Sequence, residues 1–211
     1  MTRAPLSRRR LLGSAALAAL LAAGVAGCDK LGLGGASEPS FHGVDITGAD
    51  YGRKLALPDF DGKERTLADF KGKVSVVFFG YTQCPDVCPT TMAELAAIKR
   101  AMGADGERVQ GIFVTIDPER DTPEVLKAYL AAFDPSFVAL RGTPDQTADA
   151  AREFKVFFAK VPGKTPGSYT MDHTAGSYVI DTQGRLRLFE RYGAPAEQLQ
   201  SDLEKLLASS G

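Results

Sequence analysis

The sequence predicts an α/β domain with a central mixed sheet flanked by helices on both faces. Two almost uninterrupted apolar runs, residues 73–80 and 109–116, are rich in β-branched and aromatic side chains, as in strands buried on both faces. Such strands need helices above and below them, and segments with a helical spacing of apolar residues follow these runs. A hairpin pattern and an amphipathic segment near the carboxyl end complete the predicted architecture.

The first strand leads into a helix. Residues 73–80 form the strand, and residues 90–102 then carry a helical stripe of apolar side chains at Met92, Leu95, Ala96 and Ile98. The second strand, 109–116, is expected to end at Asp117-Pro118, because proline has no N–H for the ladder of a sheet. The order so far is strand, helix, strand.

Two further helices begin with the same signal. Thr122-Pro123 opens a helix that runs to about Phe133, and Thr143-Pro144 opens one that runs to about Phe154. In both, threonine is the expected N-cap, and proline occupies the first helical position, where its missing N–H has no partner to lose.

The last part of the chain predicts a hairpin and a closing helix. Residues 177–181 and 185–190 have the pattern of short antiparallel strands, joined by a turn at residues 182–184. Residues 195–207 have the periodicity of an amphipathic helix. The whole order of elements is that of a thioredoxin-like fold.

Residues 1–28 have the pattern of a bacterial lipoprotein export signal. Arg8-Arg9-Arg10 provide a charged start, an apolar run covers residues 11–23, and Ala26-Gly27 lead up to Cys28. Cys28 is therefore predicted to carry lipid after cleavage; the alternative is an uncleaved anchor, although the run is short and alanine-rich for a membrane-spanning helix. Both arrangements place the domain outside the cytoplasm, tethered to a membrane, and the expected location is the periplasmic face of the inner membrane. Sec and twin-arginine export both stay open.

The rest of the chain divides into a linker and a domain. Residues 29–40, with their glycine, alanine, serine and proline, indicate a flexible linker, and residues 41–211 are long enough for one domain with a sizeable core. Removal of residues 1–27 takes away four arginines and no acids, so Lys plus Arg falls from 25 to 21 against 26 Asp plus Glu, and the net charge changes from −1 to −5. An acidic exported domain without a basic stripe is not expected to bind nucleic acid.

Cys84 and Cys88 form the candidate functional pair. Once Cys28 is assigned to lipid, they are the remaining cysteines of the three in the sequence. Their spacing, i and i+4, lets both sulfurs face the same side, where a metal ion or an S–S bond could join them. In an oxidising compartment the pair is either a disulfide or a metal site, and so small a loop gives a structural bridge little to stabilise.

The residues around the pair predict how reactive it is. The segment follows a buried strand and leads into a helix, so both thiols are expected near a helix N-terminus, where the dipole favours thiolate. Pro85 and Pro89 restrict the backbone, and Tyr81 and Val87 are interpreted as packing or shielding residues. Asp86 has two interpretations: an acid that bonds helix N–H groups, which is favoured, or a group that tunes the site from outside.

The two histidines are His42 and His173. His173 lies in the polar stretch 168–175, just before the apolar hairpin strand, so a loop or strand edge is expected there. His42 has no ligand-like neighbours in the sequence. A lone histidine is more often structural than functional, so the residues by themselves leave the third ligand open.

Three separated segments carry motifs. They are 79–91, which contains Cys-Pro-Asp-Val-Cys, then 115–123, which contains Asp-Pro-Glu-Arg-Asp, and finally Asp172-His173-Thr174. In this order they closely resemble the Sco/SenC family of copper-handling thioredoxin-like proteins, and the similarity covers residues 41–207. Gln83 is the one substitution, at a position where many relatives carry histidine or another polar residue, and it is not interpreted as a ligand.

The resemblance implies that Cys84, Cys88 and His173 bind copper, as Cu(I) with Cu(II) as a second form. It also implies a role in assembling the dinuclear copper centre of cytochrome c oxidase subunit II. Two thiolates and an imidazole are a soft set that suits Cu(I), whereas a closed structural zinc site normally needs four ligands. Oxidation of Cys84 and Cys88 to a disulfide would release the metal, so copper binding and redox state are expected to be linked.

Two functions from different classes remain open. In the first, the chain is a metallochaperone, a binding protein without turnover that delivers copper to subunit II. In the second, it is a thiol-disulfide oxidoreductase that keeps the cysteines of the copper centre reduced, or a peroxidase, with Cys84 and Cys88 as nucleophile and resolving thiol. The cysteine spacing and His173 favour the first, because a thioredoxin-type reductase usually has Cys-x-x-Cys and needs no imidazole.

Overall fold

The computed structural model describes residues 40–209 of the chain. The export signal, the lipid attachment at Cys28 and nearly all of the predicted linker lie outside these residues, so they and the domain boundaries stay predictions. Within residues 40–209, no helix has both the length and the apolar character needed to cross a membrane.

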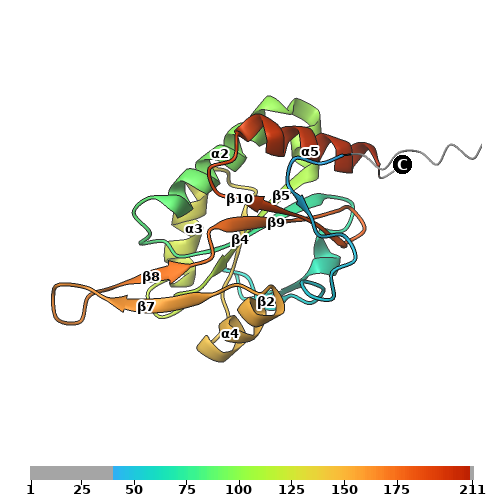
Figure 1. Cartoon of the computed structure of the whole chain (residues 1–211). Helices are drawn as coiled ribbons and strands as arrows, with labels where there is room; N and C mark the ends of the chain where they lie inside the picture. Colours follow the sequence, from blue (N-terminus) through green and yellow to red (C-terminus); the bar gives the residue numbers. More distant parts are fainter. Residues whose placement is uncertain (1–39, 210–211) are drawn as a thin grey trace, which may run out of the picture. The chain divides into compact units, whose positions relative to one another are not determined.

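A mixed sheet of six strands forms the centre of the domain, in the order β1-β10-β9-β4-β5-β6 (Figure 1). β4 pairs with β5 in parallel and with β9 antiparallel, and β5 pairs with β6 in parallel. The strands are β1 (Val44–Asp45), β4 (Val74–Gly80), β5 (Val109–Thr115), β6 (Val138–Leu140), β9 (Gly176–Ile180) and β10 (Leu186–Arg191). The predicted α/β architecture with a mixed sheet is confirmed.

The helices cover this sheet. α2 and α5 lie side by side over one face, α4 lies on the other side, and α3 contacts the edge strand β6 (Figure 1). The bounds are α2 (Val87–Ala101), α3 (Pro123–Ala131), α4 (Pro144–Glu153) and α5 (Ala196–Ala208), with short 3-10 helices at η2 (Leu67–Phe70) and η3 (Gly103–Arg108). The predicted caps are confirmed, because the hydroxyls of Thr122 and Thr143 accept hydrogen bonds from the first turns of α3 and α4.

The core centres on the two predicted central strands. Every residue of β4 and β5 is buried, and Phe78, Phe79 and Phe113 are among the largest fully buried side chains. Burial of one such ring stabilises a fold by roughly 1.5–3 kcal/mol. The end of β4, from which the cysteine segment starts, is therefore firmly held.

The helix after β4 begins earlier than the sequence predicts. α2 starts at Val87 instead of residue 90, so Cys88 lies in its first turn and Cys84 precedes it. Pro89 does not delay this start, because a first turn leaves the N–H of that position unpaired in any case.

Two small hairpins flank the main sheet. One joins β2 (Ala56–Pro58) to β3 (Glu64–Thr66). The other joins β7 (Phe158–Pro162) to β8 (Tyr169–His173), with Phe158 paired to His173, and it projects from the body of the domain (Figure 1). We call it the β7–β8 hairpin. The sequence did not predict it, since β7 is largely exposed and carries no clear apolar alternation.

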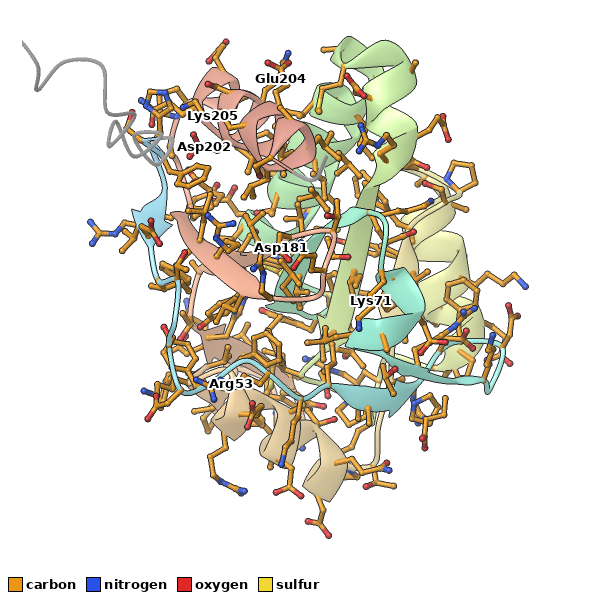
Figure 2. The ribbon with its side chains drawn as sticks, turned by 90° about the vertical axis from the view of Figure 1, so that its right-hand side faces the viewer. Arg53, Lys71, Asp181, Asp202, Glu204 and Lys205 are labelled. Carbon is orange, nitrogen blue, oxygen red and sulfur yellow. The ribbon has the colours of Figure 1, made fainter. Side chains whose placement is uncertain are left out.

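The start of the described chain is fastened to α5. Asp202 accepts hydrogen bonds from the N–H groups of His42 and Gly43, at 2.7 and 2.8 Å, and Lys205 donates to the carbonyl oxygen of Ser40 (Figure 2). The side chain of His42 is exposed, so this histidine is held by its backbone.

Candidate metal centre

The two cysteines lie where β4 passes into α2. The N–H of Cys84 donates to the carbonyl oxygen of Tyr81 at 3.2 Å, which closes a turn after the strand. The N–H of Cys88, in the first turn of α2, points at the sulfur of Cys84 at 3.4 Å. A Cβ at Gly80 would lie 2.9 Å from the Cys88 sulfur, so the close approach of backbone and thiol depends on glycine here.

The exposure of the two thiols differs. Cys88 is completely buried, whereas Cys84 is partly exposed, and both are free thiols. The predicted disulfide between them therefore stays a prediction for the oxidised state.

His173 reaches this point from the β7–β8 hairpin. It is the last residue of β8, as expected of a strand edge, and its Nε2 lies 3.6 Å from the Cys88 sulfur. Its Nδ1 lies 3.0 Å from the carbonyl oxygen of Thr174, an arrangement in which Nδ1–H donates and Nε2 keeps its lone pair. The rings of Phe78 and Tyr81 meet the imidazole edge-on, at 5.8 and 6.1 Å between centroids.

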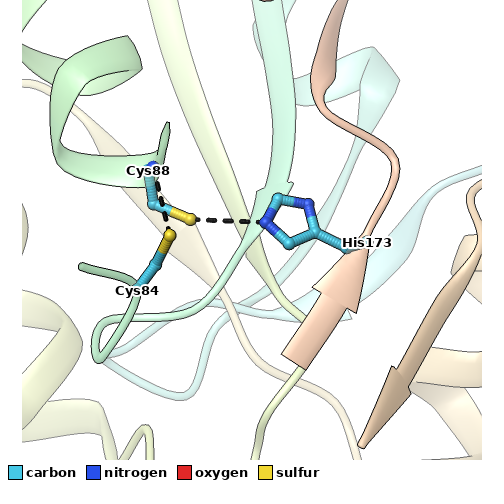
Figure 3. A group of neighbouring side chains, drawn as sticks. All are labelled: Cys84, Cys88 and His173. Carbon is cyan, nitrogen blue, oxygen red and sulfur yellow. Dashed lines mark hydrogen bonds between the residues drawn. The ribbon is translucent and has the colours of Figure 1, made fainter. Parts of the chain in front are cut away.

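Cys84, Cys88 and His173 thus form one group (Figure 3). Their sulfur and nitrogen ligand atoms all lie within 4.8 Å of one another, although the imidazole comes from a separate hairpin. Two thiols and an imidazole whose Nε2 carries no proton are suitable ligands for a soft metal ion such as Cu(I). Within residues 40–209 no other group of histidines, cysteines and acids meets this criterion, and His42 is not part of the group.

Burial changes the pKa of both Cys88 and His173. It raises the pKa of the Cys88 thiol far above its usual range, so the expectation that the helix N-terminus favours thiolate is wrong for Cys88. Loss of hydration is the largest cause of this shift. Burial also lowers the pKa of His173, which keeps the imidazole neutral and able to bind a metal. A metal that binds here has to displace the proton of Cys88.

The favoured interpretation of Asp86 is wrong. Asp86 occupies the N-cap position of α2, but its exposed side chain makes no capping hydrogen bond within the described chain. Its backbone angles, φ −143° and ψ −75°, differ from the extended conformation that usually aims a capping side chain at the first turn. Tyr81 and Val87, by contrast, are confirmed as packing residues against the core.

A network that the sequence interpretation did not assign lies beside the cysteine segment. Asp121 is fully buried and accepts hydrogen bonds from the hydroxyls of Thr82 and Thr115, both at 2.6 Å. Burial raises the pKa of this carboxyl. Its neighbours Asp117 and Arg120 contact the β7–β8 hairpin. The second motif, 115–123, is the sequence signal for this network, because it contains these charged residues.

Comparisons with known proteins agree with the fold and with the motifs. The family model described as SCO1/SenC matches residues 44–208. The SCO2-like protein of Rickettsia conorii is 36% identical over 151 residues, which cover 71% of this chain and 74% of the relative.

Two solved structures are similar over most of the domain. Bradyrhizobium japonicum ScoI with copper bound is 43% identical, with a TM-score of 0.66, over 72% of this chain and 97% of that one. Apo Sco1 from Thermus thermophilus is 39% identical, with a TM-score of 0.70, over 82% of this chain and 99% of that one. These similarities confirm the thioredoxin-like fold, and the chain belongs to the SCO1/SenC family.

Proposed function

We propose that the chain binds copper as cargo through Cys84, Cys88 and His173 and delivers it to the dinuclear copper centre of cytochrome c oxidase subunit II. The observation that carries this proposal is the convergence of two thiols and one imidazole within 4.8 Å. Such a soft set favours Cu(I). The copper-bound relative from Bradyrhizobium japonicum, 43% identical, supports the choice of metal. The oxidase as destination rests on what the resemblance to the Sco/SenC family implies.

The arrangement suits a cargo more than a permanent cofactor. Three protein ligands leave one coordination position of the metal open. A ligand of the acceptor protein can bind the metal there before this chain releases it. Cys84 and His173 are both partly exposed, so exchange can begin at either of them, while the buried Cys88 is the last to be reached.

We also propose that the domain is exported and held at the periplasmic face of the inner membrane by lipid on Cys28. The pattern of residues 1–28 supports this. Mass spectrometry of protein extracted from membranes is expected to find a diacylglyceryl group on Cys28 at the amino terminus. An intact Met1 would support an uncleaved anchor instead.

The second candidate is a thiol-disulfide oxidoreductase for the cysteines of the same copper centre. The unequal exposure of Cys84 and Cys88 favours it, because an accessible thiol can attack while a buried one waits. The Cys84 thiolate would attack a disulfide of the partner and form a mixed disulfide, with release of one partner thiol. Cys88, after losing its proton, would then attack Cys84, so the partner leaves as a dithiol and the chain keeps the disulfide.

One experiment separates the two functions. Cu(I)-loaded chain and copper-free reduced chain are each mixed with a subunit II domain, the first with reduced apo domain and the second with domain whose cysteines form a disulfide. Copper appearing on the acceptor in the first mixture is expected for the metallochaperone. Reduction of the acceptor in the second, with oxidation of Cys84 and Cys88, is expected for the oxidoreductase. Failure of both would overturn the proposed partner.

A further inference from the structure

We propose that Arg120 is a positioning residue, which holds the β7–β8 hairpin against the cysteine segment and thereby places His173 beside the two thiols. This inference rests on the copper-binding function proposed above, and it gives a role to the charged motif 117–121. The hairpin needs such a fastening, because Lys160, Val161 and Pro162 of β7 are exposed and bury little apolar surface.

The hydrogen bonds of Arg120 join the two segments directly. Its Nη1 donates to the side-chain oxygen of Gln83 at 3.1 Å and to the carbonyl oxygen of Tyr169 at 2.9 Å. Gln83 immediately precedes Cys84, and Tyr169 is the first residue of β8, the strand that ends at His173. One guanidinium nitrogen therefore contacts both of the segments whose relative position determines the site.

Aromatic rings extend this link to the imidazole. The guanidinium carbon of Arg120 lies 3.6 Å from the centroid of the Tyr169 ring and 5.7 Å from that of Tyr81. Tyr81 in turn meets His173 edge-on at 6.1 Å. Both rings offer their electron-rich faces to the cation, which helps explain how the buried Nη2 tolerates having no hydrogen-bond partner among the described residues.

Asp117 holds the arginine in this orientation. One of its carboxylate oxygens accepts a hydrogen bond from Nε of Arg120, and the other accepts one from the hydroxyl of Tyr169 at 2.9 Å. Asp117 is only 1% exposed, so its charge needs a close partner. A lysine could balance this charge, but its single ammonium cannot reproduce the planar fork that serves Asp117, Gln83 and Tyr169 together.

The same motif supplies a matched control. Glu119 and Lys160 form an ion pair of 2.7 Å between the motif and β7, but both side chains are about half exposed, at 57% and 47%. Exposed pairs of this kind contribute little, so Glu119→Gln changes a charge in the same loop without releasing the hairpin.

The first test measures Cu(I) affinity of the lipidated full chain in detergent, by competition with a Cu(I) chelator. Arg120→Gln is expected to weaken binding about 10- to 100-fold, as is typical of groups that orient metal ligands, and Glu119→Gln by less than about twofold. In a His173→Ala background, Arg120→Gln is expected to change affinity by less than about twofold. Equal losses in the two backgrounds would overturn positioning through His173.

The second test needs no copper. Nuclear Overhauser effects between the ring of His173 and the rings of Phe78 and Tyr81 are expected to weaken in Arg120→Gln and Arg120→Lys but not in Glu119→Gln. Unchanged effects in the arginine variants would overturn the inference. If the unaltered chain does not bind Cu(I), the proposed function fails, and this measurement still decides the role of Arg120. If Arg120→Gln does not fold, Arg120→Lys, which keeps the charge partner of Asp117, gives both readouts.

Discussion

Cys88 and His173 lie 3.6 Å apart but are held by very different surroundings. Cys88 is completely buried in the first turn of α2, against the end of a strand that is buried at every position. His173 ends a projecting hairpin whose other strand, β7, is exposed from Lys160 onward. Close packing fixes the position of Cys88, whereas a few polar and aromatic contacts fix that of His173. The site therefore has a tightly packed side, the core side, and a more exposed side, the hairpin side.

Under the proposed function, this difference would help the protein to release its metal. Displacement of the hairpin would then withdraw the proposed ligand His173 while most of the core stays packed. A site with three ligands from the core would hold copper more permanently.

The largest effect is expected from removing the donors of the core side. Oxidation of Cys84 and Cys88 to a disulfide leaves no thiolate, so the chain is expected to lose Cu(I) uptake altogether. Reduced and oxidised chains are titrated with Cu(I), with the disulfide verified by mass spectrometry. Oxidised chain that still takes up one Cu(I) would contradict the assignment of both sulfurs.

Removing the donor of the hairpin side comes next. His173→Ala is expected to weaken Cu(I) binding about 100-fold or more, since removal of a ligand should exceed the effect of removing a residue that orients one. His42→Ala, which alters an exposed side chain held by its backbone, serves as the control and is expected to change affinity by less than about twofold. Equal effects of the two substitutions would remove His173 from the site.

A matched pair of valines tests the rigidity of the two sides. Val77 in β4 is fully buried and Val161 in β7 is 37% exposed. Val77→Thr is expected to lower the free energy of unfolding by about 1–3 kcal/mol, because it buries a hydroxyl, and Val161→Thr by less than about 0.5 kcal/mol. Urea denaturation measures both. Similar losses would mean that the hairpin is as firmly packed as the core.

The smallest effect concerns the desolvation of His173. Burial lowers its pKa, so the unfolded chain takes up this proton near pH 6.5 and the folded chain only at lower pH. The free energy of unfolding should therefore be unaffected above pH 7 and fall as the pH drops below 6.5 toward the pKa in the folded state. Between pH 7.5 and 5.5 the unaltered chain is expected to lose more stability than His173→Gln, in which this group cannot take up a proton. If the free energies of unfolding of the two chains changed in parallel with pH, the prediction would be wrong, and the imidazole of His173 would be hydrated.

The core side was predictable from the sequence, and the hairpin side mostly was not. β4 and β5 are continuous apolar runs, a signal that local sequence carries well. β8 is joined to the motif 117–121 through Tyr169, which contacts Arg120 and Asp117, and periodicity does not encode such contacts between distant segments. Proximity of the two cysteines follows from their spacing alone. By contrast, 85 residues separate Cys88 from His173, so the third ligand came from the resemblance and not from the residues.

The two errors at the site have different physical causes. The thiolate expected for Cys88 and the capping bond expected for Asp86 were both inferred from a position near a helix N-terminus. Whether the dipole prevails depends on burial, and whether a side chain caps depends on the backbone angles before the helix. Spacing along the chain determines neither of these quantities.

The pairing of Phe158 with His173 defines the register of the β7–β8 hairpin. Neighbouring side chains on a strand point to opposite faces, so a slip of one residue between the strands would present Asp172 or Thr174 where the imidazole now lies. One residue inserted within β8 should therefore turn the imidazole of His173 away from the two thiols. Binding would lose its third ligand although Cys84, Cys88 and His173 are all still in the sequence. The same insertion in the connecting loop, residues 163–168, would leave the register of the two strands unchanged. The proposed copper binding would therefore depend on the register of β8, a strand of only five residues.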